Sequence, residues 1–198
     1  MISRPLVIGA VVMLAVALGM GSYVWHMRSV SGSDLVTAKP QAAVAPPVLG
    51  SSEQVTLYVA YDDIGVVRAE RFRIPLPEER QQRAEELLRT LLNIYLDKSS
   101  PHPLGTGSEV RNVYLVDPGL AVIDLNTAFA NGHRSGILVE DLTVASLVQT
   151  LSANISGISR VKILVDGKER DTLAGHADLT SFYDVTAVEQ LVMQLQTQ

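Results

Sequence analysis

The chain has 198 residues and carries 16 Lys and Arg against 21 Asp and Glu, a net charge of −5. This acidic balance argues against nucleic-acid binding, because clustered basic side chains dominate the affinity for phosphate backbones. The sequence contains no cysteine, which excludes disulfides, thiolate metal ligands, cysteine nucleophiles and acylation as a lipoprotein.

The segment from Leu6 to Trp25 contains no charged, histidine or amide side chain. A helix of that length spans roughly 30 Å, the thickness of the hydrocarbon core of a bilayer. Its last residues include Tyr23, and aromatic rings of this kind favour the headgroup region. We therefore expect an N-terminal transmembrane anchor over residues 1–27, with the span at residues 6–25.

Two other interpretations of this segment remain open. A cleaved signal peptide has a shorter apolar core, and Ala17 and Gly19 resemble its cleavage site. A buried helix of a soluble protein is the second alternative. The flanking charges, with Arg4 before the segment and Arg28 after it, do not decide the orientation.

Residues 28–52 are rich in Ser, Ala, Gly and Pro and contain no aromatic residue, which is typical of a flexible linker. A flexible chain of this length reaches roughly 25–30 Å. A folded domain is expected from residue 53 to residue 183, tethered near the bilayer, followed by a C-terminal helical segment at 184–198.

Two strands and a helix open the predicted domain. The strands are Val55–Tyr61 and Val66–Ile74, and the turn Asp62-Asp63-Ile64-Gly65 joins them. The helix follows Pro77, and its apolar residues recur at helical spacing: Ala84, Leu87, Leu88, Leu91, Leu92 and Tyr95.

The second half of the domain repeats this alternation. Strands are predicted at Val110–Val116 and Leu120–Leu125, then a loop at Thr127–Gly136 and a second amphipathic helix from Leu138 to Ile155. Asp166-Gly167 is a strong type I′ hairpin signal between a strand at Val161–Val165 and a charged edge strand at Lys168–Leu173. With an amphipathic helix at Asp184–Gln196, this order predicts an α+β fold: a mainly antiparallel sheet with two or three helices packed on one face, plus the transmembrane helix.

Several groups could carry chemistry, but each has a simpler structural interpretation. Gly132-His133-Arg134-Ser135-Gly136 places its serine one residue too late for a nucleophile elbow, so Ser135 is expected to cap a helix. Gly105-Thr106-Gly107-Ser108 lacks the lysine of a phosphate loop and precedes a strand, so it is read as a loop.

Neighbouring acidic residues and scattered histidines complete these candidates. The acidic pairs are expected in turns or on solvated helix faces: Asp62-Asp63, Glu78-Glu79, Glu85-Glu86 and Glu140-Asp141. His26, His102, His133 and His176 lack metal-ligand spacing, and His176-Ala177-Asp178 suits a hydrogen-bonded turn. The sequence therefore predicts no catalytic, cofactor-binding or metal-binding residue, no cofactor, and no enzyme activity.

Short motifs across the predicted domain follow one another in a recognisable order. They are VTLYVAY at 55–61, the Leu-rich helix through Leu92, SPHPLGT at 100–106, AVIDL at 121–125 with Phe129, VQTL at 148–151, VKILVDG at 161–167 and GHADLT at 175–180. In this order and spacing the chain resembles the GerMN domain family of sporulation and spore-germination proteins. The resemblance implies a bacterial envelope protein with its domain outside the cytoplasmic membrane and with no known catalysis.

We therefore expect a membrane-anchored, non-catalytic interaction module acting in sporulation, germination or envelope assembly. Its expected partners are other envelope proteins, with peptidoglycan and a second copy of the chain left open. The edge strand Lys168–Leu173 or the C-terminal helix would supply the binding surface. One rival is an enzyme or regulator acting on peptidoglycan, with Asp124, His133 or His176 meeting a carboxylate in a cleft. The other is a small-ligand sensor with a closed apolar pocket between helices and sheet.

Overall fold

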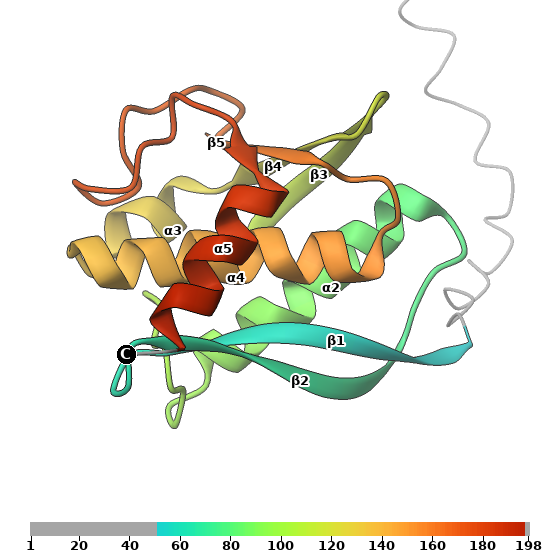
Figure 1. Cartoon of the computed structure of the whole chain (residues 1–198), viewed down its shortest axis with the longest axis horizontal. Coiled ribbons are helices and arrows are strands. Elements are labelled where there is room, and N and C mark those ends of the chain that lie inside the picture. Colours follow the sequence, from blue (N-terminus) through green and yellow to red (C-terminus); the bar gives the residue numbers. More distant parts are fainter. Residues whose placement is uncertain (1–50, 197–198) are drawn as a thin grey trace, which may run out of the picture. The chain divides into compact units, whose positions relative to one another are not determined.

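The computed structural model describes residues 51–196, which lie within a single compact unit (Figure 1). The predicted anchor, and all but the last two residues of the predicted linker, lie outside the described residues. Between residues 51 and 196, no helix combines the length and apolarity that a bilayer crossing requires.

The described chain begins with a hairpin that matches the prediction. Strand β1 covers Ser52–Tyr61 and pairs antiparallel with β2, Val66–Pro75. Helix α2 follows at Arg80–Leu96 and buries the six apolar residues expected from their spacing. The side chain of Glu79 caps this helix by accepting hydrogen bonds from the backbone N–H groups of Gln81 and Gln82.

A second sheet contains the four remaining strands in the order β3-β4-β5-β6. The first two, β3 (Val110–Val116) and β4 (Leu120–Leu125), have the predicted bounds and pair antiparallel. Strand β5 (Arg160–Val165) lies parallel to β4, because a helical crossover rather than a tight turn connects them. The two-residue strand β6, Tyr183–Asp184, pairs antiparallel with β5.

The crossover between β4 and β5 differs from the prediction in two ways: it contains an additional short helix, and its long helix is more deeply buried than expected. Residues 127–132, expected as loop, form the short helix α3 (Thr127–Gly132), capped by the side chain of Asn126. Helix α4 covers Ile137–Asn154, close to the predicted bounds. It is not amphipathic, however, because every residue from Leu142 to Leu151 is buried.

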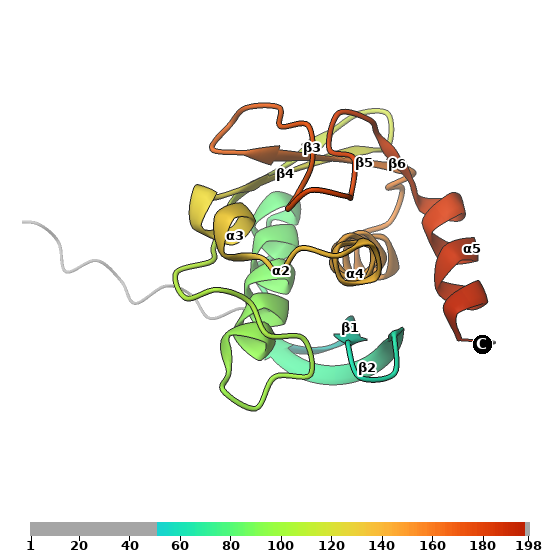
Figure 2. The same ribbon diagram turned by 90° about the vertical axis from the view of Figure 1, so that its left-hand side faces the viewer.

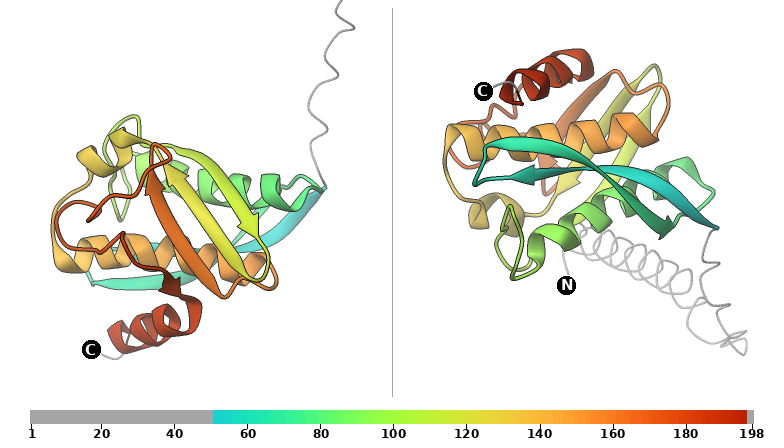
Figure 3. Two further views of the ribbon diagram at one scale, coloured as in Figure 1. Left: turned by 90° about the horizontal axis from the view of Figure 1, so that it is seen from above. Right: turned by 60° about the horizontal axis from the view of Figure 1, so that its bottom comes forward.

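Figure 2 shows why α4 is buried on all sides along this stretch: α2 and α4 lie between the four-stranded sheet and the β1–β2 hairpin. The two views of Figure 3 show the sheet on one side of these helices and the hairpin on the other. The expectation of one mainly antiparallel sheet with helices on a single face is therefore wrong in its layering. The α+β class is confirmed, with one antiparallel and one mixed sheet.

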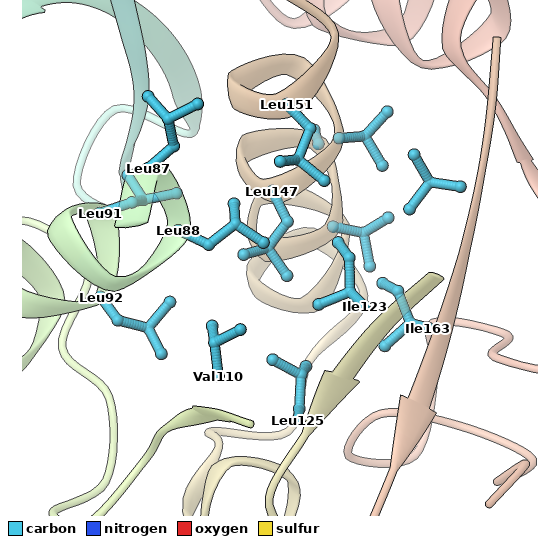
Figure 4. Close-up of a cluster of buried hydrophobic side chains, with 14 of the residues drawn as sticks. Leu87, Leu88, Leu91, Leu92, Val110, Ile123, Leu125, Leu147, Leu151 and Ile163 are labelled. Carbon is cyan, nitrogen blue, oxygen red and sulfur yellow. The ribbon is translucent and has the colours of Figure 1, made fainter. Parts of the chain in front are cut away.

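The main hydrophobic core fills the space between the helices and the four-stranded sheet. Leucines of α2 and α4 face the buried side of β3, β4 and β5, as Figure 4 shows. The labelled side chains are Leu87, Leu88, Leu91, Leu92, Val110, Ile123, Leu125, Leu147, Leu151 and Ile163, and each is at most 2% exposed.

The prediction of an edge strand at Lys168–Leu173 is wrong, because no strand forms there. The type I′ turn forms, with Asp166 and Gly167 both at positive φ (50° and 70°), but pairing stops at the bridge between Val165 and Lys168. Residues 169–182 instead run as irregular chain. Lys162 on β5 holds this segment, because its buried ammonium group donates to the carbonyl oxygens of Leu179 (2.9 Å) and Thr180 (2.6 Å).

The C-terminal helix α5, Val185–Leu195, confirms the predicted amphipathic segment. Its buried residues Val188 and Val192 belong to the domain's own core, and the Asp184 side chain caps its first turn. Part of the apolar face of α5 is therefore buried against the rest of the domain.

One polar contact between layers is more extensive than the rest. The outward edge of β1 has no neighbouring strand, and side chains from the helices bond its backbone instead. Asn154 accepts from the N–H of Thr56 (3.1 Å) and donates to its carbonyl (2.7 Å). Thr150 accepts from the N–H of Tyr58 (2.9 Å), whose carbonyl accepts from Ser146. The Tyr95 hydroxyl of α2 accepts from the N–H of Ala60 (2.9 Å).

This arrangement predicts that Thr150→Val destabilises the domain although it preserves the shape of the side chain. The substitution leaves the N–H of Tyr58 without its acceptor, and an unsatisfied backbone donor away from water costs about 1–3 kcal/mol. Urea unfolding measures the free energy. Ser152→Ala on the same helix is the matched control, because that hydroxyl bonds only a carbonyl of its own helix. Equal losses in the two variants would contradict the role of Thr150.

Candidate functional site

A chain of buried polar side chains lies at the turn end of the β1–β2 hairpin. Asp62 directly follows β1, and its N–H donates to the carbonyl of Pro101 (3.1 Å), which fixes the loop that follows α2. That loop places His102 beside Asp62, with 2.6 Å between His102 Nδ1 and Asp62 Oδ1. His102 is only 1% exposed.

Helix α4 joins a second histidine to this chain. The Thr143 hydroxyl lies 2.7 Å from His102 Nε2 and 2.7 Å from His133 Nε2. His133 Nδ1 faces the carbonyl of Arg134 (2.7 Å) and must therefore carry a proton, since a carbonyl oxygen only accepts. The order of groups is thus Asp62, His102, Thr143, His133, and we call these four residues the histidine chain.

The first three groups reproduce the acid–imidazole–hydroxyl order of serine hydrolases, but their environment does not support that chemistry. Thr143 is fully buried and also lies 3.0 Å from the carbonyl of Val139 in its own helix. A nucleophile must reach the substrate's carbonyl carbon, and this hydroxyl is enclosed by protein. The arrangement is suited to holding the hairpin, the loop after α2 and α4 together.

Burial also sets the protonation of the two imidazoles. Desolvation lowers the pKa of His102 more than the neighbouring Asp62 carboxylate raises it. Desolvation likewise lowers the pKa of His133. With both rings neutral, each Nε2 is an acceptor, and the Val139 carbonyl is a third acceptor. The single Thr143 proton can therefore serve only one of these three groups at a time.

A surface hollow of about 540 Å³ opens beside the histidine chain. Its lining includes Asp62, Asp63 and Arg134, and Arg134 donates to Asp62 Oδ2 over 2.7 Å. Arg134 is more than half exposed, so its remaining donors face water. The hollow is open and charged, unlike the closed apolar pocket that a small-ligand sensor would need.

Glu140 forms a second buried polar centre, and this position contradicts the expected solvated helix face. Its carboxylate accepts from the backbone N–H groups of Gly136, Ala174, His176 and Ala177 at 2.9–3.1 Å. His176 Nδ1 lies 2.9 Å from the same carboxylate. Burial opposes ionisation, but these hydrogen bonds outweigh it and lower the pKa of Glu140 to about 2.

The remaining candidates have structural roles. Ser135 does not cap α4, because Gly136 occupies the N-cap position; its hydroxyl lies 3.4 Å from His176 Nδ1. Gly105 packs on Gly132 so closely that a Cβ there would lie 2.8 Å from the Gly132 Cα, which explains the small residues of that loop. His176 and Asp178 do not form the expected hydrogen-bonded pair: Asp178 accepts from Thr180 in a turn, and His176 pairs with Glu140.

Of the three residues named for a peptidoglycan enzyme, only His176 pairs with a carboxylate, that of fully buried Glu140, and the three lie in separate parts of the domain. Asp124 accepts from the N–H of Gly167 (2.7 Å), His133 belongs to the histidine chain, and His176 contacts Glu140. Across the part of the chain that the structure describes, no three His, Asp or Glu side chains are grouped closely enough to hold a metal ion. His26 lies outside the described residues.

Sequence patterns did not point to the roles of two buried polar residues described above, Thr143 and Glu140. Thr143 was treated only as part of an apolar helix, although Thr143, Ser146, Thr150 and Asn154 recur on one helical face and so form a polar stripe. Glu140 had no comparable signal, because its partners Ala174–Ala177 come from a segment far along the chain.

Comparison with known proteins gives a matching family and several similar solved structures. The family model described as "Germane: Sporulation and spore germination" matches residues 56–171. The tandem GerMN domains of the sporulation protein GerM from Bacillus subtilis are 24% identical, with 66% of this chain and 45% of that chain covered and a TM-score of 0.49. The first of those domains is 22% identical, with 66% and 95% covered and a TM-score of 0.48.

A protein from Clostridium perfringens described as a candidate lipoprotein is also similar. It is 18% identical, with 71% of this chain and 92% of that chain covered and a TM-score of 0.47. No curated protein matches the chain.

Replacing Glu140 by glutamine should destabilise the domain by about 3 kcal/mol at pH 7, because an amide meets four N–H donors with one neutral acceptor. A carboxylate whose pKa is lowered in the folded state stabilises above its unfolded value and loses that contribution as the pH falls. The difference between wild type and Glu140→Gln should therefore shrink between about pH 4.5 and pH 2. Urea unfolding at several pH values measures it. Exposed Glu78→Gln is the control, and a pH-independent difference would refute the assignment.

The histidine chain predicts a separate pH dependence. The folded pKa values of His102 and His133 lie below the ordinary value of 6.5, so the unfolded state takes up protons first as the pH falls. The free energy of unfolding should decrease below about pH 6.5, by at most about 1.4 kcal/mol per pH unit for each histidine. His133→Asn removes one titrating group and should give a shallower decrease. Constant stability from pH 7 to pH 5 would contradict this account.

Proposed function

Because this chain belongs to the Germane family of sporulation and spore-germination domains, we propose that it is a membrane-anchored interaction module of the bacterial cell envelope. The family match over residues 56–171 is the observation that carries the proposal. In this view residues 6–25 anchor the protein in the cytoplasmic membrane, and residues 28–52 tether the domain on its extracytoplasmic side. The domain acts in sporulation, germination or envelope assembly by binding other envelope proteins.

The side-chain chemistry supports a role without catalysis. Three of the groups that could act as acid, base or nucleophile, Glu140, His102 and Thr143, are each at most 1% exposed and form hydrogen bonds inside the domain. Catalytic groups must instead contact a substrate in a cleft. Their burial favours a rigid scaffold that presents its surface to partners.

The description of the Clostridium perfringens protein as a candidate lipoprotein is compatible with an envelope location, but a lipid anchor of that type is not available here. Lipoprotein acylation modifies a cysteine, and this sequence has none. An apolar span of residues 6–25 would provide the attachment instead.

Membrane fractionation tests the anchor. The full-length protein should remain with membranes after carbonate washing, and protease added from the outer side should digest its C-terminal domain. Replacing Leu14 and Ala15 by arginine places two charges in the middle of the span, each costing about 2.5–3.5 kcal/mol on insertion, and should release the protein. Arginines at Val44 and Ala45, in the predicted linker, form the matched control. A freely soluble mature chain beginning after Gly19 would refute the anchored module.

A further inference from the structure

The two edges of the β1–β2 hairpin differ in how their backbone groups are satisfied. The outward groups of β1 are bonded by Asn154, Thr150, Ser146 and Tyr95, so this edge is closed to another strand. Strand β2 forms the other edge and lies at the outside of the layered structure (Figure 1 and Figure 2).

The pairing register identifies the free groups of β2. Val55 lies opposite Phe72 and Leu57 opposite Glu70, and the N–H groups of Thr56 and Tyr58 point away from β2. Even-numbered residues of β2 therefore bond β1, and odd-numbered residues direct their N–H and C=O groups outward. The Val67 carbonyl lies on this edge and accepts from the side-chain amide of Gln196 (2.8 Å).

Beyond Val67 the edge is open. The outward residues Ala69, Arg71 and Arg73 are exposed, and no residue of the described range 51–196 bonds their backbone groups. A row of unpaired N–H and C=O groups on a ten-residue strand is a template for an added strand.

Charge distinguishes this edge from the rest of the domain. Residues 51–198 contain 13 Lys and Arg against 20 Asp and Glu, yet β2 contains three arginines and one glutamate. Glu70, which accepts from the Tyr61 hydroxyl, and Arg68 project from one face of the strand, and Arg71 and Arg73 project from the other. Arg71 and Arg73 form no ion pair with any described residue. The free edge is therefore basic within an acidic domain.

We propose that the free edge of β2, residues 69–73, binds an extended acidic segment of another protein as an added β-strand. This inference rests on the proposed interaction role and names the surface and the partner chemistry. Alternate residues of a strand are about 6.6–6.8 Å apart, so acidic side chains at every second position of the partner match Arg71 and Arg73. Main-chain hydrogen bonds supply the pairing, and the charges select the partner.

The same arginines disfavour other occupants of the edge. Two copies joined through β2 would bring their arginines together, and like charges on adjacent strands are destabilising. An anionic lipid surface would attract the arginines but would leave the row of N–H and C=O groups without a strand partner.

The direct test uses full-length protein in a mild detergent and a fluorescent, end-capped decapeptide of alternating glutamate and valine. Fluorescence anisotropy should detect saturable binding that weakens with salt, while the peptide with lysine in place of glutamate should bind at least tenfold more weakly. Hydrogen exchange of the Ala69, Arg71 and Arg73 amides should slow on binding, because pairing protects the outward N–H groups. Unchanged exchange with bound peptide would overturn strand addition.

Variants separate charge from backbone pairing. Arg71→Glu should weaken binding at least tenfold, whereas Lys98→Glu, with the same change in net charge at an exposed position outside β2, should change it less than twofold. Arg71→Pro removes the outward N–H and should bind more weakly than Arg71→Ala, which keeps it; edge strands tolerate proline where the N–H faces solvent. Equal binding by the proline and alanine variants would contradict pairing.

Three further results would each overturn the inference. They are slow exchange of these amides in the free protein, dimerisation lost in Arg71→Pro, and preference for phosphatidylglycerol vesicles over the acidic peptide. These readouts do not depend on where the protein resides. A protein that fractionates with membranes but ignores the peptide therefore refutes only this inference, while a soluble protein that binds the peptide refutes only the proposed anchoring.

Discussion

The polar seam between α4 and β1 is the interaction on which the described domain depends. Four polar residues of one helical face, Thr143, Ser146, Thr150 and Asn154, line a helix that is otherwise enclosed by apolar side chains. Three of them bond the outward edge of β1 directly, and Thr143 reaches Asp62 at the end of that strand through His102. No strand lies beside the outward edge of β1, so burial would leave its backbone N–H and C=O groups without hydrogen-bond partners. The polar seam supplies those partners and avoids the cost of desolvation.

Two buried charged residues, Glu140 and Lys162, bond backbone groups in the C-terminal half, as the polar seam does for the hairpin. Glu140 of α4 accepts four backbone N–H groups, three of them from residues 174–177, and Lys162 of β5 donates to the carbonyls of Leu179 and Thr180. An irregular segment has no ladder of its own to satisfy its backbone, so charged side chains of regular elements take that role. Both charged side chains are used in this way, so they hold the irregular segment in place.

Local patterns in the sequence were sufficient for the elements but not for their arrangement. The bounds of β3 and β4 could be predicted because alternating apolar residues flank a Pro-Gly turn. Asp166-Gly167 likewise predicted its turn. The strand expected after this turn does not form, because Glu140 and Lys162 bond the backbone of the segment that follows and hold it as irregular chain. These contacts join residues 17 to 37 positions apart. Periodicity is a local signal and carries no information about such partners, so the burial of Glu140 and the position of α4 between two layers could not be predicted.

The residues that cover the two edges of the hairpin differ in their position relative to the matched family range. The match begins at Thr56 and ends at Asp171, so it contains the α4–β1 seam but excludes α5. Helix α5 packs Val188 and Val192 into the core, and Gln196, directly after it, bonds the carbonyl of Val67 on β2. The C-terminal extension therefore covers the turn end of this edge. The polar seam that closes the edge of β1 thus lies within the family range. Gln196, which bonds the edge of β2 next to its open part, lies outside that range.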